Sequence, residues 1–138
     1  MIRNVLSVFI GAIVWMAGFL ALASLLAALW PAYQVHGRAW TQDGVFTFTS
    51  LMACFNLLFW AIAAFAAGWV AMKIATRREA VWVLAGIVAG YLIVLHIVLY
   101  WPTFPWWYNL GVVIPCVPAI LLGTKLAGAS PAKTVAAG

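Results

Sequence analysis

Four long apolar runs, separated by short polar segments, dominate the chain. They extend over about residues 5–30, 50–72, 80–101 and 106–126. The first three lack Asp, Glu, Lys and Arg, and the fourth reaches full length only by passing Lys125. A helix needs about 20 apolar residues to cross a bilayer. Because lipid cannot satisfy bare peptide groups, each run should be helical. The pattern predicts an all-α polytopic membrane protein, an antiparallel bundle of four transmembrane helices.

The segments between the runs divide into one long and two short connections. Residues 31–49 are longer than most connections, and we expect an outer loop along the membrane interface. Thr76-Arg77-Arg78-Glu79 has the spacing of a capping box, which predicts that Thr76 and Glu79 cap the third helix. Two prolines in residues 102–105 predict a tight hairpin before the fourth helix.

The domain organisation follows from the same pattern. Residues 1–127 form one transmembrane domain in this interpretation, and no separate soluble domain remains. Residues 128–138 are small and polar, and we expect them to be a flexible cytoplasmic tail. Arg3, an apolar stretch and Ala21-Leu22-Ala23 also look like a signal peptide. The apolar run is much longer than a signal core of about 7–15 residues, so we expect the first span to be retained.

Positive charge predicts the orientation of the spans. The chain has seven Lys or Arg and two acidic residues. On one side of the predicted membrane lie Arg3, Lys73, Arg77, Arg78, Lys125 and Lys133. The other side has only Arg38, together with Asp43. The positive-inside rule places both termini in the cytoplasm, which an even number of spans also requires. We therefore expect a multi-pass membrane protein with both termini on the cytoplasmic side.

Composition excludes several classes of protein. Hydrophobic residues make up 68% of the chain and charged residues 7%, whereas a soluble domain is about a quarter charged. A soluble enzyme, a disordered tail and a nucleic-acid binder are therefore not expected, because the few positive charges are too scattered to form a nucleic-acid patch. Cys54 and Cys116 lie in apolar runs without close spacing, so neither a disulfide framework nor a metal site is predicted.

Small residues recur on each predicted helix where close packing would need them. Within lipid, helices associate through such small residues and through interhelical hydrogen bonds. We interpret them as contacts within the bundle rather than as a dimer face. The candidate packing residues are Gly11, Gly18, Ala63, Ala67, Gly86, Gly90 and Gly123.

Four polar residues lie at a similar depth in the spans. Counted from the outer helix ends, they are roughly 5–9 Å below the interface. Three of them share helix faces with small residues, so the simplest packing turns them inward. The four are Ser24, Asn56, His96 and Asn109.

Two interpretations of this layer remain open. The favoured one is hydrogen bonding between helices. The other is a small polar pocket that opens outward, with His96 at its floor and residues 31–49 above it, because an ionisable residue inside a membrane is a functional hypothesis by default. The candidate contacts in the outer loop are His36, Arg38 and Asp43.

Enzymatic chemistry is not expected from these residues. No Asp or Glu lies within a span, so a carboxylate for proton coupling or acid–base catalysis is lacking. Cys-x-x-Cys and glycine-rich phosphate motifs are also missing. A bis-histidine haem would need a second histidine, and only His36 in the loop is available. We expect neither a cofactor nor a metal.

Three sequence features resemble a known group of proteins. The first helix has Gly11, Trp15 and Gly18, the second ends in Gly68-Trp69-Val70-Ala71, and the fourth begins with Pro105-Trp106-Trp107-Tyr108. Together they are similar to a loose group of small four-span bacterial inner-membrane proteins without an assigned activity. The resemblance implies a multi-pass protein of the bacterial inner membrane, and it implies no activity.

The leading functional prediction is a non-enzymatic accessory or assembly subunit that acts through helix–helix contacts. Its partners would be the lipid bilayer and another membrane protein or a second copy of itself. The alternative is a small transporter or binder of an apolar or weakly polar solute, which would use the polar layer in the outer leaflet. Nucleic acid is not an expected partner.

Overall fold

The computed structural model describes residues 1–128, with the side chain of Asp43 left out. The predicted tail, except Gly128, therefore lies outside the described residues. The described part contains helices and no strand. Its elements are α1 (Ile2–Leu29), α2 (Pro31–Asp43), α3 (Ser50–Ile74), α4 (Glu79–Leu92), the π-helix η1 (Ile93–Leu99) and α5 (Trp106–Gly128).

Four of these helical segments are long and apolar enough to cross a membrane. They are α1, α3, α4 continued by η1, and α5. Their mean hydropathy over the best window is between 1.9 and 2.4. The helices coincide with the four predicted apolar runs, so the predicted all-helical class with four candidate spans is confirmed.

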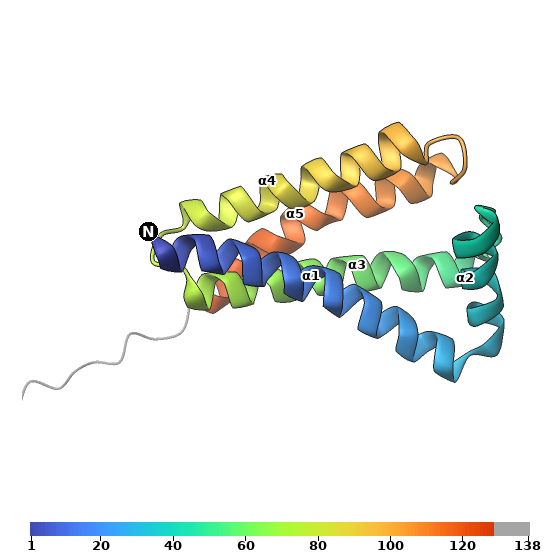
Figure 1. The fold of residues 1–138 in the computed structure, drawn as a ribbon, viewed down its shortest axis with the longest axis horizontal. Coiled ribbons are helices and arrows are strands. Elements are labelled where there is room, and N and C mark those ends of the chain that lie inside the picture. Colours follow the sequence, from blue (N-terminus) through green and yellow to red (C-terminus); the bar gives the residue numbers. More distant parts are fainter. Residues whose placement is uncertain (129–138) are drawn as a thin grey trace, which may run out of the picture.

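The four long helices extend along the length of the molecule (Figure 1). The N-terminus and the α3–α4 connection are at one end, and α2 and the α4–α5 connection are at the other. Helix α3 packs most extensively, against α5 and α1. Toward the α2 end, α1 leans away from α4, and α2 crosses that end of the bundle (Figure 1). Helices α1 and α4 are thus close together at the N-terminal end and apart at the α2 end, whereas α4 and α5 stay side by side (Figure 1).

Glycines create the closest helix contacts. A Cβ atom at Gly68 would overlap the backbone of Ile120, and one at Gly123 would overlap the carbonyl of Phe65. Helices α3 and α5 therefore approach each other backbone to backbone. On α1, a Cβ atom at Gly18 would lie 3.5 Å from the Cβ of Ala63.

The remaining candidate packing residues divide into two groups. Gly11 packs against Leu84, and Ala63 and Ala67 are buried, as expected. The prediction is wrong for Gly86 and Gly90 as contacts within the chain. Both are exposed, and a Cβ atom at either would meet no other atom within 4 Å. The reason is that α4 contacts its neighbours through the opposite face, where Leu84 and Val88 are buried.

The predicted outer loop is mostly helical, which corrects the expectation for residues 31–49. Trp30 adopts an extended conformation that ends α1, and Pro31 then stands in the first turn of α2, where its fixed φ angle and missing N–H are well tolerated. Gly44 ends α2 in the left-handed conformation with φ 67°, which glycine adopts at little cost. Within the predicted loop, only residues 44–49 are non-helical.

The predicted capping box is also wrong. Helix α4 begins at Glu79, and no side chain caps its first turn. The backbone N–H and the hydroxyl of Thr76 instead donate to Asn4 Oδ1, at 2.9 and 2.8 Å. The amide of Asn4 on α1 thus occupies both donors, so the α3–α4 connection is joined to the N-terminal helix.

Candidate functional site

His96 lies within the π-helix η1, which continues α4 in the third candidate span. In η1 the hydrogen bonds close wider turns, and the N–H of Tyr100 donates to the carbonyl of Leu95 at 2.9 Å. Such π-helical turns are rare and are frequently found at functional sites. They change the direction of the side chains that follow, so η1 determines where His96 and Tyr100 point.

His96 is held by a hydrogen-bonded chain of buried groups. Its Nδ1 lies 3.1 Å from Oδ1 of Asn109 on α5. The Nδ2 of Asn109 donates to the carbonyl of Phe104 in the α4–α5 connection, at 3.3 Å. His96 is 3% exposed and Asn109 is fully buried. The hairpin that joins the third and fourth spans therefore fixes the imidazole.

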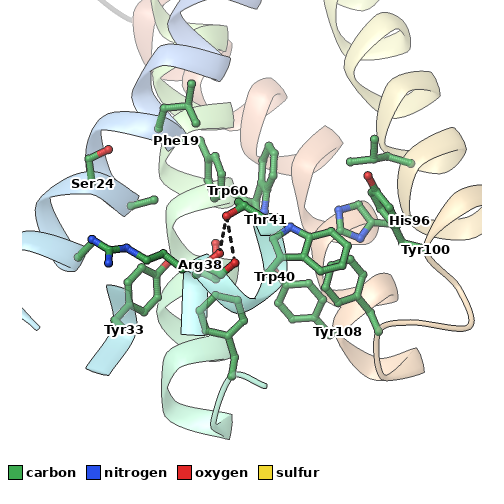
Figure 2. A pocket seen from close by; sticks show the side chains of 18 of the residues that line it. Phe19, Ser24, Tyr33, Arg38, Trp40, Thr41, Trp60, His96, Tyr100 and Tyr108 are labelled. Carbon is green, nitrogen blue, oxygen red and sulfur yellow. Dashed lines mark hydrogen bonds between the residues drawn. The ribbon is translucent and has the colours of Figure 1, made fainter. Parts of the chain in front are cut away.

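A cavity of about 600 Å³ lies at the α2 end of the bundle. Residues of α1, α2, α3 and η1 line it, together with residues at the ends of α4 and α5. Figure 2 shows Phe19 and Ser24 on one side and His96 and Tyr100 on the other, with Trp60 between them. Aromatic side chains form much of the wall, among them Phe19, Trp40, Trp60, Tyr91, Tyr100 and Tyr108.

Three members of the predicted polar layer line this cavity. They are Ser24, Asn56 and His96. Asn56 is buried, whereas Ser24 is exposed on the part of α1 that leans away from α4. Asn109 does not line the cavity, and it contacts His96 instead. The tertiary structure thus separates the layer into cavity residues and one residue that positions the histidine.

Two polar atoms of the cavity residues lack a hydrogen-bond partner. They are Oδ1 of Asn56 and Nε2 of His96, and both atoms are buried. A buried polar group without a partner is unfavourable by about 1–3 kcal/mol. Both residues line the cavity, and buried polar groups are usually paired with the protein or with ordered water.

The candidate residues of the predicted outer loop have different positions. Arg38 is exposed and lines the cavity. His36 does not line it, and its Nδ1 lies 2.7 Å from the hydroxyl of Thr47, so it joins α2 to the segment before α3. The side chain of Asp43 lies outside the described part of the structure. Only Arg38 is therefore placed at the cavity.

Trp40 and Trp60 are cavity residues that sequence analysis did not single out. The ring of Trp40 lies 4.9 Å from that of Tyr100 and 4.4 Å from that of Phe104, which connects α2 to the opposite wall. The ring of Trp60 stacks on Phe19 at 3.8 Å. Aromatic residues at helix ends are expected at a membrane interface. The same residues can also turn inward, and the sequence does not separate the two cases.

Tyr33 on α2 adds a neutral polar group to the lining. It is 4% exposed, and burial raises the pKa of its phenol to about 12. At neutral pH the group is therefore an uncharged hydroxyl that can donate or accept a hydrogen bond.

The lining of the cavity combines apolar and aromatic walls with separate polar side chains. Among the described residues, no group of three or more His, Cys, Asp or Glu side chains lies together. The cavity lining described here contains neither Asp nor Glu. The walls are apolar and aromatic, with a few polar groups directed at separate points, which is the usual composition of a small-molecule site.

Comparison of the chain with protein-family models, curated proteins and solved structures found no match. The resemblance to small four-span bacterial inner-membrane proteins therefore stays a prediction, and the site has to be interpreted from its own geometry.

Proposed function

We propose that this protein binds an apolar or weakly polar solute in the aromatic cavity at the α2 end of the bundle. This was the alternative prediction from the sequence. The observation that carries it is a cavity of about 600 Å³ with buried polar atoms of Asn56 and His96 that have no partner. Pockets for small molecules usually enclose about 300–1,000 Å³ and combine apolar walls with few polar groups.

The position of the cavity favours a solute that enters from the lipid. Ser24 lines it from α1 and is exposed, so the cavity borders the outer surface of the bundle beside that helix. Arg38 on α2 is also exposed and lines it. An amphipathic molecule at the interface would therefore contact both α1 and α2 as it enters.

We further propose that the bundle is antiparallel in the bacterial inner membrane, with both termini in the cytoplasm and the cavity in the outer leaflet. Figure 1 supports this arrangement, since the N-terminus and the α3–α4 connection share one end. Arg3, Arg77 and Arg78 belong to these segments, and positive charge favours the cytoplasmic side. A reporter enzyme that works only in the cytoplasm should be active when it is fused after Gly138. Activity of a reporter that works only in the periplasm, fused at the same position, would contradict the arrangement.

A binding experiment tests the proposed function. The protein is embedded in nanodiscs and dialysed against radiolabelled 4-butylanisole, an apolar ring compound with one ether oxygen. Empty nanodiscs correct for partition into lipid. We expect saturable binding in excess of the empty nanodiscs. Binding that rises in proportion to the probe, as in empty nanodiscs, would contradict the proposal.

A matched pair of variants connects this binding to the cavity. Ala23 lines the cavity, whereas Ala21 on the same helix is exposed and does not line it. Ala23→Trp should fill the space and abolish saturable binding, and Ala21→Trp should bind like the original protein. Equal binding by the two variants would place the ligand elsewhere.

The accessory-subunit prediction keeps one specific observation in its favour. Gly86 and Gly90 form an exposed Gly-x-x-x-Gly pair without a contact in the described chain. Small residues at this spacing allow close helix association in lipid. Gly90→Ile should then remove any protein that co-purifies in mild detergent. Unchanged co-purification, or a lone monomer from the start, would count against this second function.

A further inference from the structure

The hydrogen bonds of His96 determine which of its ring nitrogens accepts. The Nδ2 of Asn109 donates to the carbonyl of Phe104, so the amide oxygen Oδ1 is the atom that faces His96. An amide oxygen only accepts, and the Nδ1 of His96 must therefore carry the hydrogen. In the neutral imidazole, Nε2 then has a lone pair and no hydrogen. The unpartnered atom of His96 is an acceptor.

The second unpartnered atom of the cavity lining has the same character. It is Oδ1 of Asn56, an amide oxygen with lone pairs only. Both side chains are more than nine-tenths buried, since His96 is 3% and Asn56 6% exposed. A carbonyl, ether or ester oxygen on a ligand would bring a third acceptor to this region and form no hydrogen bond with either. These two buried atoms therefore need a donor from a ligand, and an acceptor would not satisfy them.

A ligand could donate from a charged ammonium group or from an uncharged hydroxyl group, and the charge of the lining favours one of the two. An ammonium group would also suit aromatic walls. However, the cationic Arg38 lines the cavity, and its described lining contains no carboxylate to balance a second cation. An unbalanced positive charge beside lipid is costly. An uncharged hydroxyl offers a donor without this cost.

From these contacts we infer that the ligand is an uncharged, apolar hydroxyl compound, such as a phenol or a ring-bearing lipid alcohol, whose O–H donates to Nε2 of His96. The inference rests on the proposed function and names its ligand class. The aromatic side chains around His96 provide surfaces for a ring, with Trp60 at 6.4 Å and Tyr108 at 6.0 Å between ring centroids. Asn109 is then a positioning residue that holds the acceptor toward the ligand.

Three matched probes test the ligand class in the nanodisc assay. They are 4-butylphenol, its methyl ether 4-butylanisole, and 4-butylbenzylamine, which is cationic at neutral pH. After correction for lipid partition, we expect the phenol to bind about tenfold more tightly than the ether, as one net hydrogen bond predicts. The amine should bind more weakly than the phenol.

The outcomes separate this inference from the proposed function. Equal affinity for the phenol and the ether would overturn the inference, while saturable binding of both would preserve the proposed function. Tighter binding of the amine would also overturn it. Absence of saturable binding by all three probes would overturn the inference together with the proposed function.

Variants then assign the selectivity to His96. His96→Phe keeps a ring but removes the acceptor, so the ratio of phenol to ether affinity should fall to about one while the ether still binds. Val98→Leu, at an exposed position of the same π-helix, should keep the original ratio. If His96→Phe does not fold, Asn109→Leu provides a second test, because loss of the partner of Nδ1 should also lower the ratio. An unchanged ratio in a folded variant would contradict the assignment.

Discussion

Gly68 of α3 lies directly against the backbone of Ile120 of α5, so closely that a single added Cβ atom would overlap the Ile120 carbonyl group. The relation is reciprocal, because Gly123 of α5 lies in the same way against the carbonyl of Phe65 of α3. Backbone atoms cannot move aside as a flexible side chain can. The α3–α5 contact therefore depends on two glycines.

Gly68→Ala should lower the free energy of unfolding by about 2 kcal/mol, because overpacking at a rigid contact typically costs about 1–3 kcal/mol. Gly123→Ala should have a similar effect. The measurement is reversible unfolding in mixed detergent micelles, followed by circular dichroism. Gly86→Ala is the matched control and should change stability little, since its Cβ atom meets nothing. Equal effects at positions 68 and 86 would refute the close contact.

The hydrogen bond between His96 and Asn109 should contribute modestly to stability. A double-mutant cycle with His96→Phe and Asn109→Leu should give a coupling energy of about 0.6 kcal/mol, the average for such bonds between membrane helices. The same unfolding assay measures it. A coupling energy of zero would show that the two side chains do not interact in the membrane.

Asn4 should matter more for stability than Glu79, contrary to the capping-box prediction. Asn4→Ala removes the acceptor of two Thr76 donors, and we expect a loss of about 1 kcal/mol. Glu79→Ala should change the free energy of unfolding by less than about 0.5 kcal/mol, since no side-chain cap is present. If Glu79→Ala lowered the free energy of unfolding more than Asn4→Ala, the result would support the capping-box prediction instead.

The buried phenol of Tyr33 predicts a loss of stability at alkaline pH. Burial raises its pKa to about 12, above the usual value of 10.0. Between these values the unfolded chain releases the proton and the folded chain keeps it, so stability falls as pH rises through that range. Tyr33→Phe should reduce this loss. In an ultraviolet titration, the folded Tyr33→Phe variant should form one fewer tyrosinate near pH 12 than the original protein. A difference between the two proteins near pH 10 would contradict the burial of Tyr33.

Most of the fold was predictable because membrane helices are determined by length and hydropathy. The four spans needed only uninterrupted apolar runs, since any backbone in lipid must satisfy its own hydrogen bonds. Helix α2 was missed although Pro31 and Gly44 stand at its two ends. Its sequence is too polar for a span, and local signals for a short helix were outweighed by the expectation of a loop.

The candidate site was predictable only in part. The position of Asn56, His96 and Asn109 along their helices follows from counting residues, and their burial agrees with the small residues that share their faces. No local pattern in residues 93–99 predicted a π-helix. Trp40 and Trp60 could as well have belonged to an interfacial belt, because the sequence shows aromatic character but not direction.

The sequence by itself determined the four apolar helices and the place of each polar side chain along its helix, because both depend on distance along one chain. Only the tertiary structure decided that Gly86 and Gly90 face outward, that Thr76 bonds to Asn4, and that α2 closes one end of a cavity beside His96. These relations depend on how each helix is rotated and tilted against its neighbours. That choice is made by the packing of side chains from distant segments, which no single segment encodes.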